Sequence, residues 1–357
     1  MSTLRPPIAI IGAGQSGLTA ARAARDAGMS PIVFEAGERA SGSWPHYYES
    51  LRVFSPAAFS TIPGYEPMSA EPDSYPGRDA VAAYLERFAE SLDVEIRTNT
   101  QVTEVTPAEH GYLVRTGSGE AIAVSAVVAA SGSFGNPRLI DLPGQSDFTG
   151  DLLHVADYRR PAAYEGRRVI VVGGGNSAVQ VGYEVSRVAQ VSLATTGPIR
   201  LIDQRPGGAD LHHLLTSGFD DLPPEWFAPF LAGPFVIDIG GYREALRAGE
   251  FDRRAMFTAF DGDSVVWADG TRERVDAVLL ATGYRPNLAY LAFGALDKHG
   301  MPHHKAGLST THPGLAYVGL EFQRTFASNT LRGVDADARF VMPALRAYAD
   351  GLHAAFR

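Results

Sequence analysis

The sequence predicts an α/β fold with two Rossmann-like dinucleotide-binding domains, the second of which is inserted into the first. Two glycine-rich loops carry this prediction, GAGQSG at residues 12–17 and GGGNSA at residues 173–178. Each loop follows a short apolar run and opens a helix-like stretch, which is the strand–turn–helix arrangement that a dinucleotide pyrophosphate needs. Glycines let the backbone approach the phosphates, and the helix end supplies free N–H groups. Because there are two loops, we expect two dinucleotides, a flavin and the nicotinamide that reduces it.

The first domain begins with an expected strand at residues 8–11, a helix over residues 16–28 and a second strand at residues 31–34. Glu35 closes that second strand, where an acid accepts hydrogen bonds from the ribose hydroxyls and repels a 2′-phosphate. We therefore expect the first loop to bind the unphosphorylated ribose of FAD or NAD. A solvated turn residue is the alternative role for Glu35.

A long irregular stretch follows over residues 41–75, rich in Ser, Pro, Gly and aromatic residues. It is too long for a simple connector, so its aromatic side chains either line a ring-shaped ligand or cover the sheet. Residues 79–91 then have the apolar stripe of an amphipathic helix. Four short strands are expected next, as a small antiparallel meander that returns to the main sheet, at residues 94–97, 102–105, 112–116 and 122–129.

Two strand ends mark the crossings between the domains. Residues 127–132 (VVAASG) and 278–283 (VLLATG) each end an apolar run in a small-small-Gly step. Prolines and glycines mark the linkers that follow the first of these steps. We therefore place a discontinuous first domain at residues 1–160 plus 284–357, and the inserted second domain at residues 163–283.

Two segments of the insert have their own signatures. Residues 203–241 are loop-like and apolar, and they either form a lid or dock against the other domain. Residues 265–271 predict a hairpin, because an Asp-Gly pair at Asp269 and Gly270 favours a tight turn between strands.

Composition excludes several functions. The net charge of −9 argues against nucleic acid or an anionic membrane as a partner. No run approaches ~18 apolar residues, which predicts no membrane span. The first strand begins by Ile8 and leaves no room for a signal peptide, so we expect a cytoplasmic protein. Cysteine is absent, which excludes disulfides, thiolate metal sites and a redox-active Cys-x-x-Cys pair, and we expect no metal site.

Residues 148–158 (FTGDLLHVADY) fit the pattern Phe-x-Gly-x-x-x-His-x-x-x-Tyr and lie shortly before the second glycine loop. The motif resembles the fingerprint of class B flavin-dependent monooxygenases, which include the N- and S-oxidising flavin monooxygenases, the plant YUCCA enzymes and the Baeyer–Villiger enzymes. Other stretches are similar to motifs of that family, so the resemblance covers essentially the whole chain: residues 42–44 (GSW), 75–78 (YPGR), 281–286 (ATGYRP), 317–320 (YVGL) and 331–334 (LRGV). The last two are similar to a short bacterial subgroup of ArsO-like and CzcO-like flavoproteins.

This resemblance implies a single-component reaction cycle. NADPH, or NADH as the alternative, would reduce FAD, and O2 would add to give a C4a-(hydro)peroxyflavin. A small-molecule substrate would then be oxygenated at a nitrogen, sulfur or carbonyl centre. The protein has to exclude water around the flavin, and no acid–base pair or nucleophile is required. The family role implied for His154 is to tie the interdomain linker together, and a catalytic base is the alternative.

The motifs select the residues that we expect at the cofactors. For FAD these are Gly12, Gly14, Gln15, Ser16, Gly17, Glu35, Gly42, Trp44, Val102, Ser131, Gly132, Gly319, Leu331, Arg332 and Gly333. For NAD(P)H they are Gly173, Gly175, Asn176, Ser177, Thr196 and Arg200.

Two departures from the family bear on these assignments. Many relatives place an Arg near Thr196 for the 2′-phosphate of NADP; that Arg is missing here, and Arg200 and Arg205 are the candidate substitutes. Animal-type members have an Asn near the reactive flavin edge, where this chain offers Ser55 before Pro56. Ser55 is the candidate catalytic residue.

Two other functions stay open from the sequence. An NAD(P)H-dependent flavoprotein oxidoreductase would pass electrons to a quinone, a metalloid or another acceptor without inserting oxygen. A non-catalytic flavoprotein that senses NAD(P)H, or that is associated with transport, is the third hypothesis. The assembly is open as well, between a monomer and a homodimer.

Overall fold

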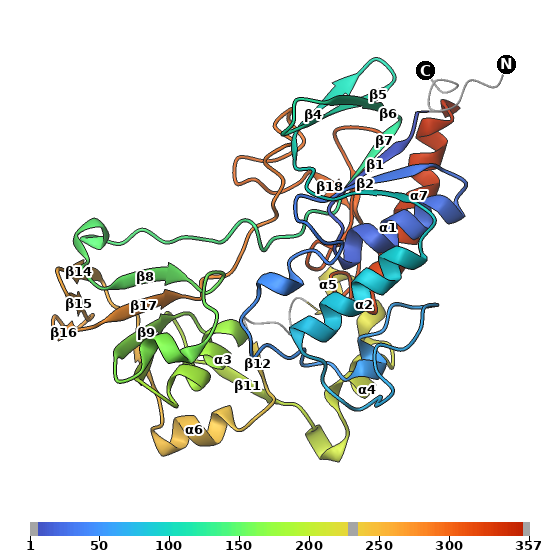
Figure 1. Ribbon diagram of the computed structural model, residues 1–357. Helices are drawn as coiled ribbons and strands as arrows, with labels where there is room; N and C mark the ends of the chain where they lie inside the picture. Colours follow the sequence, from blue (N-terminus) through green and yellow to red (C-terminus); the bar gives the residue numbers. More distant parts are fainter. Residues whose placement is uncertain (1–5, 228–234, 353–357) are drawn as a thin grey trace.

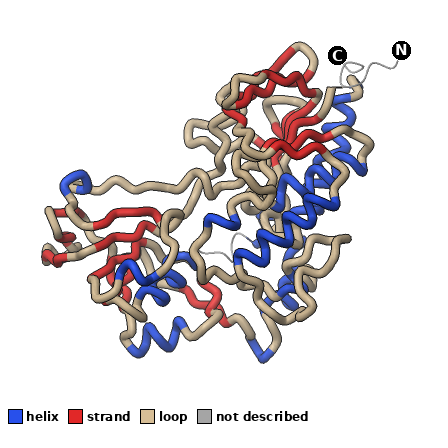
Figure 2. Tube along the Cα trace, viewed as in Figure 1, coloured by secondary structure: helices blue, strands red, loops and turns tan. Residues whose placement is uncertain are grey.

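The computed structural model describes residues 6–227 and 235–352. They form two domains, each built on its own sheet of mainly parallel strands (Figure 1). The segments that run between the domains are mostly loop (Figure 2). Both apolar runs before the glycine loops form buried strands, which confirms the α/β class and the two dinucleotide-binding domains.

The first domain is built on a seven-stranded sheet with the order β18-β19-β20-β7-β1-β2-β3. Strands β20, β7, β1, β2 and β3 run parallel, while β18 and β19 are antiparallel at one edge. The strands are β1 (Ile8–Ile11), β2 (Pro31–Phe34), β3 (Glu95–Arg97), β7 (Ala126–Ala129), β18 (His304–Lys305), β19 (Leu308–Ser309) and β20 (Leu315–Tyr317). Three of these strands come from beyond residue 284, so the C-terminal stretch completes the first sheet.

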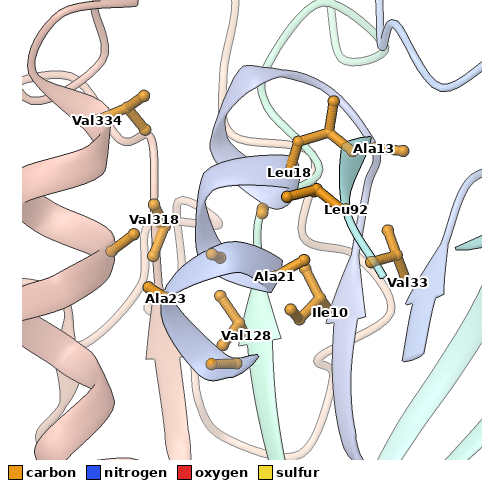
Figure 3. Close-up of a cluster of buried hydrophobic side chains, with 14 of the residues drawn as sticks. Ile10, Ala13, Leu18, Ala21, Ala23, Val33, Leu92, Val128, Val318 and Val334 are labelled. Carbon is orange, nitrogen blue, oxygen red and sulfur yellow. The ribbon is translucent and has the colours of Figure 1, made fainter. Parts of the chain in front are cut away.

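Three helices accompany this sheet, α1 (Gln15–Asp26), α2 (Arg78–Ser91) and α7 (Val334–Ala349). Figure 3 shows α1 between α7 and the strands, with Ala21 close to Ile10. The alanine-rich face of α1 is buried, because small side chains let the helix approach both neighbours closely. A buried ion pair of 2.6 Å between Arg22 and Asp335 also ties α1 to α7.

A small antiparallel sheet of three strands is attached to the first domain and confirms the predicted meander from residue 102 onward, whereas the strand expected at residues 94–97 is β3, which pairs parallel with β2 in the main sheet. The strands of the small sheet are β4 (Val102–Ala108), β5 (Gly111–Thr116) and β6 (Ala121–Val124). The chain then returns directly to the main sheet as β7, next to β1.

The second domain is built on five parallel strands with the order β13-β10-β9-β17-β8. They are β8 (Asp151–His154), β9 (Arg168–Val172), β10 (Gln190–Thr195), β13 (Asp252–Ala255) and β17 (Ala277–Leu280). Strand β8 precedes the boundary predicted at residue 160, yet it pairs with β17, so this sheet begins earlier in the chain than predicted. Only one of its four residues is buried, which is why no strand pattern marks it in the sequence.

Smaller elements complete the second domain. Its helices are α3 (Asn176–Val185) and α6 (Tyr242–Ala248), and two short helices, α4 (Leu211–Leu215) and α5 (Pro224–Phe227), lie in the segment between them. Its minor strands are the parallel pair β11 (Arg200–Asp203) and β12 (Phe235–Asp238), and the antiparallel β14 (Ala259–Asp261), β15 (Ser264–Val266) and β16 (Arg272–Arg274). The predicted Asp-Gly hairpin is confirmed between β15 and β16, where Trp267 N donates to Thr271 O at 2.9 Å. Short 3-10 turns occur at 44–46, 57–59, 145–147, 161–164, 206–208 and 219–221.

Residues 204–227, which we call the strap, leave the second domain and lie against the first. Gln204 Nε2 donates to the carbonyl oxygen of Phe54 at 2.9 Å. At the far end, the ring of Phe227 contacts the rings of Phe322 and Phe326, with centroids 4.9 and 5.2 Å away. Of the two alternatives for residues 203–241, docking against the other domain therefore holds for the strap, and residues 228–234 lie outside the described part.

Candidate functional site

The first glycine loop contains two glycines that the chain itself requires. Gly12 has a φ of +105°, and a Cβ there would lie 2.6 Å from the carbonyl oxygen of Ala130. A Cβ on Gly17 would overlap the carbonyl oxygen of Gly12. These two glycines therefore serve the tight turn and the close contact between helix and strand.

Gly14 is different, because no contact within residues 6–227 and 235–352 requires a glycine at this position. Its φ of −81° and ψ of −172° suit any residue, and the nearest heavy atom to an added Cβ is Gly42 Cα at 3.6 Å. Gly14 also caps α1 without a side-chain hydrogen bond, which leaves N–H groups of the first turn available to an anion. The space beside Gly14 thus suits a ligand phosphate.

Glu35 lies directly beside this loop. Its Oε2 accepts a hydrogen bond from Ala13 N at 2.7 Å, and its Oε1 accepts one from Gly37 N at 2.8 Å. The carboxylate is therefore fixed at the carboxyl end of β2, next to the turn after β1. An acid held there is placed for ribose hydroxyls.

The second glycine loop repeats this division of roles. Gly173 has a φ of +138°, and a Cβ there would overlap the carbonyl oxygen of Ala281. Gly175 has an ordinary φ of −94°, and no heavy atom lies within 4 Å of an added Cβ among the described residues. Gly14 and Gly175 thus occupy matching positions at the helix starts of the two domains, and each leaves open space where a phosphate would approach.

Both domains open onto one cavity of about 890 Å³. Of the residues expected at the cofactors or in catalysis, the structure places these on its wall: Gly12, Gly14, Gln15, Ser16, Glu35, Gly42, Trp44, Ser55, Val102, Ser131, Gly132, Asn176, Ser177, Gly319, Leu331 and Arg332. The others lie off the wall: Gly17, Gly173, Gly175, Thr196, Arg200 and Gly333. The cavity therefore joins the first glycine loop to the start of α3 in the second domain.

Several wall residues were not predicted. Tyr284, Gln180, Phe134 and Asn287 reach the cavity from segments far apart in the sequence. Tyr284 belongs to the ATGYRP motif, so the motif was a signal that could have selected it. The other three lie outside every quoted motif, and only the fold brings them to the site.

Aromatic rings form one side of the cavity. The ring of Tyr47 lies 4.5 Å from that of Phe134, which in turn stacks on Tyr284 at 5.5 Å. Burial raises the pKa of both tyrosines above the usual value, so these phenols stay protonated. They provide an apolar wall with hydroxyl donors.

The two hypotheses for the aromatic residues of 41–75 each hold for part of the stretch. Trp44, Tyr47, Tyr48 and Phe54 line the cavity. Tyr65 instead contacts Tyr84 and Phe88 of helix α2, where it belongs to the core around α1 and α2.

Hydrogen bonds connect the first loop to distant segments. Trp44 Nε1 donates to Gln15 Oε1 at 3.2 Å, and Gln15 Nε2 donates to the carbonyl oxygen of Asn329 at 2.7 Å. Asn329 lies in the turn before α7 and also lines the cavity. One side chain, Gln15, thus joins three walls of the site.

Ser55 is held at the cavity wall by local contacts. Its hydroxyl lies 2.7 Å from that of Ser60, and the preceding Phe54 carbonyl is bonded to Gln204 of the strap. The Phe54 ring lines the cavity as well, and His212 of the strap stacks against it at 6.1 Å. A catalytic role for Ser55 stays a prediction.

The remaining residues expected at the second dinucleotide lie in two groups. Asn176 is tied to β12, since its Oδ1 accepts from Ile237 N at 3.0 Å, while Ser177 faces the cavity. Thr196 is exposed at the carboxyl end of β10, and Arg200 is exposed at the start of β11. Arg205 lies near Tyr75 of the first domain, whose hydroxyl donates to Asp210 Oδ2 at 2.5 Å.

His154 is the last residue of β8, where it pairs with Leu280 of β17 in the second domain, and it does not line the cavity. Its Nδ1 accepts a hydrogen bond from Ala156 N at 3.1 Å, and its ring meets Tyr284 edge-on at 5.0 Å. Burial lowers the pKa of His154 below its usual value of 6.5. This geometry fits the linker-tying role better than that of a base.

The described ranges, 6–227 and 235–352, contain no group of three His, Asp or Glu side chains arranged to hold a metal ion. None of their helices combines the length and the apolar character that a bilayer crossing needs.

Two parallel sheets, each with a phosphate-type loop and a shared cavity between them, define a two-dinucleotide oxidoreductase. Residues 9–207 match the family described as pyridine nucleotide-disulphide oxidoreductase. A flavin-containing monooxygenase from Stenotrophomonas maltophilia has a similar solved structure, with a TM-score of 0.83 and 30% identity, over 96% of this chain and 98% of that one.

Two curated relatives are similar to this chain over most of its length. The uncharacterized oxidoreductase CzcO of Bacillus subtilis (strain 168) is 25% identical, over 93% of this chain and 97% of its own length. The indole-3-pyruvate monooxygenase YUCCA1 of Oryza sativa subsp. japonica is 27% identical, over 79% of this chain and 78% of its own. The chain belongs to the pyridine nucleotide-disulphide oxidoreductase family and, within it, to the class B flavin monooxygenases.

Proposed function

We propose that this enzyme is a single-component monooxygenase that uses FAD and NAD(P)H to transfer one oxygen atom from O2 to a small molecule. The acceptor would be a nitrogen, sulfur or carbonyl centre. The observation that carries the proposal is the shared cavity, to which both glycine-loop helices contribute. A nicotinamide bound at α3 and a flavin bound at α1 would meet inside it.

The residues of the first domain fit FAD. Open space beside Gly14 accommodates the pyrophosphate, and Glu35 is fixed for the ribose. Leu331 and Arg332 lie in the turn before α7 and line the same cavity. The N–H groups of this turn would meet the pyrimidine edge of the flavin. When reduced, the bound flavin supplies the electrons that activate O2.

The chain's own residues would exclude water and orient the nicotinamide. The Tyr47, Phe134 and Tyr284 rings enclose one side of the cavity with apolar surface. Removal of water strengthens every polar interaction in the site and prevents loss of activated oxygen as hydrogen peroxide. Gln180 on α3 bonds to the hydroxyl of Tyr48, which connects the nicotinamide-side helix to the wall of the flavin site.

The test is anaerobic reduction of the purified flavoprotein with NADPH or NADH, followed by stopped-flow mixing with oxygenated buffer. A transient spectrum that differs from both the reduced and the oxidised flavin, with little hydrogen peroxide released, supports the monooxygenase. Transfer of one atom of ¹⁸O from ¹⁸O2 into an amine, sulfide or ketone would establish the insertion. Direct return to oxidised flavin would overturn the proposal and favour electron transfer to another acceptor.

A further inference from the structure

The second domain lacks the acid that the first domain places beside its ribose position. By strand register, Glu35 stands opposite Gly12 in the first sheet, and Thr195 stands opposite Gly173 in the second. Thr195 therefore occupies the position that corresponds to Glu35. A carboxylate there disfavours a 2′-phosphate, and a threonine removes that repulsion.

A cation is held at this threonine. Arg253 lies on β13, the strand next to β10, and pairs with Leu193. Its Nε donates a hydrogen bond to Thr195 Oγ1 at 2.7 Å, so the side chain runs along the sheet toward the carboxyl end of β10. The Thr195 hydroxyl donates in turn to the carbonyl oxygen of Gly197 at 2.7 Å, which fixes its lone pairs toward Arg253.

The guanidinium of Arg253 has hydrogen-bond donors that no other described group uses. Arg253 is an exposed residue, and it forms no ion pair within residues 6–227 and 235–352. The next residue, Arg254, has the opposite character, because it bonds Glu273 at 2.6 Å and lies over the Trp267 ring. The terminal nitrogens of Arg253 are therefore available to a ligand anion.

Thr195 also connects this cation to the glycine loop. A Cβ added to Gly174 would lie 3.7 Å from Thr195 Cγ2, so the threonine side chain borders the turn that would hold the pyrophosphate. The ribose next to that pyrophosphate would then lie near the end of β10. In the first domain, Glu35 places a charge of −1 beside the proposed ribose position. In the second domain, Arg253 places a charge of +1 at the corresponding position.

We propose that Arg253 is the specificity-determining residue that binds the 2′-phosphate of the nicotinamide dinucleotide, so the second site prefers NADPH to NADH. The inference rests on the proposed function, because it assumes that the second loop binds a nicotinamide dinucleotide. A guanidinium pairs with phosphate oxygens through charge-assisted hydrogen bonds, which are among the stronger polar contacts in proteins. The cation would come from β13 and not from the loop after β10, where Arg200 and Arg205 were the candidates.

The first experiment measures binding of two probes, 2′,5′-ADP and 5′-ADP, to the flavin-loaded protein by isothermal titration calorimetry. We expect Arg253→Ala to weaken binding of 2′,5′-ADP about 10- to 100-fold, the range for loss of a hydrogen bond to a charged group. Binding of 5′-ADP should change less than about twofold, because no 2′-phosphate is present. Arg274→Ala, at an exposed arginine of the same domain, is the matched control and should leave both affinities unchanged.

Other outcomes overturn the proposal. Equal loss of both probes would mean that Arg253 acts only on the local fold through Thr195. No loss in Arg253→Ala, with loss in Arg200→Ala, would assign the phosphate to Arg200. A second variant, Arg253→Lys, keeps the charge without the fork and should retain part of the 2′,5′-ADP affinity, which a purely structural role would not restore.

Steady-state kinetics give a second readout. KM for NADPH should rise in Arg253→Ala while KM for NADH and kcat with either nucleotide stay close to wild type. This result is separable from failure of the proposed function. If wild type binds 2′,5′-ADP but never inserts oxygen, the monooxygenase proposal fails and the role of Arg253 stands. If wild type inserts oxygen but Arg253→Ala binds 2′,5′-ADP normally, only the role of Arg253 fails.

Discussion

Asp220 of the strap and Arg332 of the turn before α7 form a bidentate salt bridge between the two domains. Arg332 Nε donates to Asp220 Oδ2 at 2.6 Å, and Arg332 Nη2 donates to Oδ1 at 2.9 Å. Their side chains are only 12% and 11% exposed. Because Arg332 also lines the shared cavity, a segment of the inserted domain fixes a side chain at the proposed flavin site.

We expect Asp220→Asn to destabilise the protein by about 3 kcal/mol, because it leaves the Arg332 guanidinium nearly buried without its counter-charge. Flavin retention should fall as well, since Arg332 is no longer fixed at the cavity wall. Chemical denaturation and the flavin-to-protein absorbance ratio measure the two effects. The matched control is Asp263→Asn, whose partner Arg274 is 75% exposed, and which should change stability by less than about 0.5 kcal/mol. Equal effects of the two variants would contradict a special role for the Asp220 pair.

Gly14 and Gly17 should respond differently to the same substitution. Gly14→Val is expected to fold but to purify without flavin, because its side chain enters the space where the pyrophosphate would lie. Gly17→Val is expected not to fold stably, since its Cβ would overlap the carbonyl oxygen of Gly12. Far-ultraviolet circular dichroism and flavin absorbance separate the two results. A fully yellow Gly14→Val protein would remove the flavin from this loop.

Gly175 allows the corresponding test in the second domain. Among the residues that the structure describes, no heavy atom lies within 4 Å of a Cβ added to Gly175. Gly175→Val should therefore fold and retain its flavin. Its flavin should be reduced by dithionite but only slowly by NADPH, because the nucleotide's phosphates are displaced. Loss of flavin from Gly175→Val, with normal loading in Gly14→Val, would exchange the assignments of the two loops.

The features that the sequence predicted well are local ones. Each glycine loop and the strand and helix beside it fall within about twenty residues of sequence. The pattern that identifies the loop is therefore contiguous along the chain. Glu35 is a good example, because it follows the second strand of the same unit and its carboxylate does lie beside Ala13 N. Local propensity and the required geometry agree at these positions.

The features that the sequence did not reveal depend on pairing between distant segments. Arg253 reaches Thr195 only because β13 pairs with β10. No local sequence pattern around Arg253 predicts this contact. Strand β8 has one buried residue out of four, so periodicity gives no signal for it. The strap resembled a loop because its contacts are with Phe54, Tyr75 and Arg332, all in the other domain.

The last prediction concerns pH, through the buried His154. Burial lowers the pKa of His154 in the folded protein below the 6.5 of an unfolded chain. Its Nδ1 accepts the N–H of Ala156, so a proton at Nδ1 would break that bond as well. As pH falls below 6.5, the unfolded chain therefore takes up the proton first. Stability that is fully present above pH 6.5 is lost on the way down to the folded pKa, at up to about 1.4 kcal/mol per pH unit for one group.

Chemical denaturation at pH 7.5, 6.5 and 5.5 measures this slope, to which buried His212 contributes in the same direction because burial also lowers its pKa. We expect His154→Asn to reduce the loss of stability between pH 6.5 and 5.5, because asparagine does not titrate and its side-chain oxygen can still accept from Ala156 N. The control is His299→Asn, at an exposed loop position, which should keep the wild-type slope. An unchanged slope in His154→Asn would mean that folding does not lower the pKa of His154, and the neutral role assigned to the buried ring would be wrong.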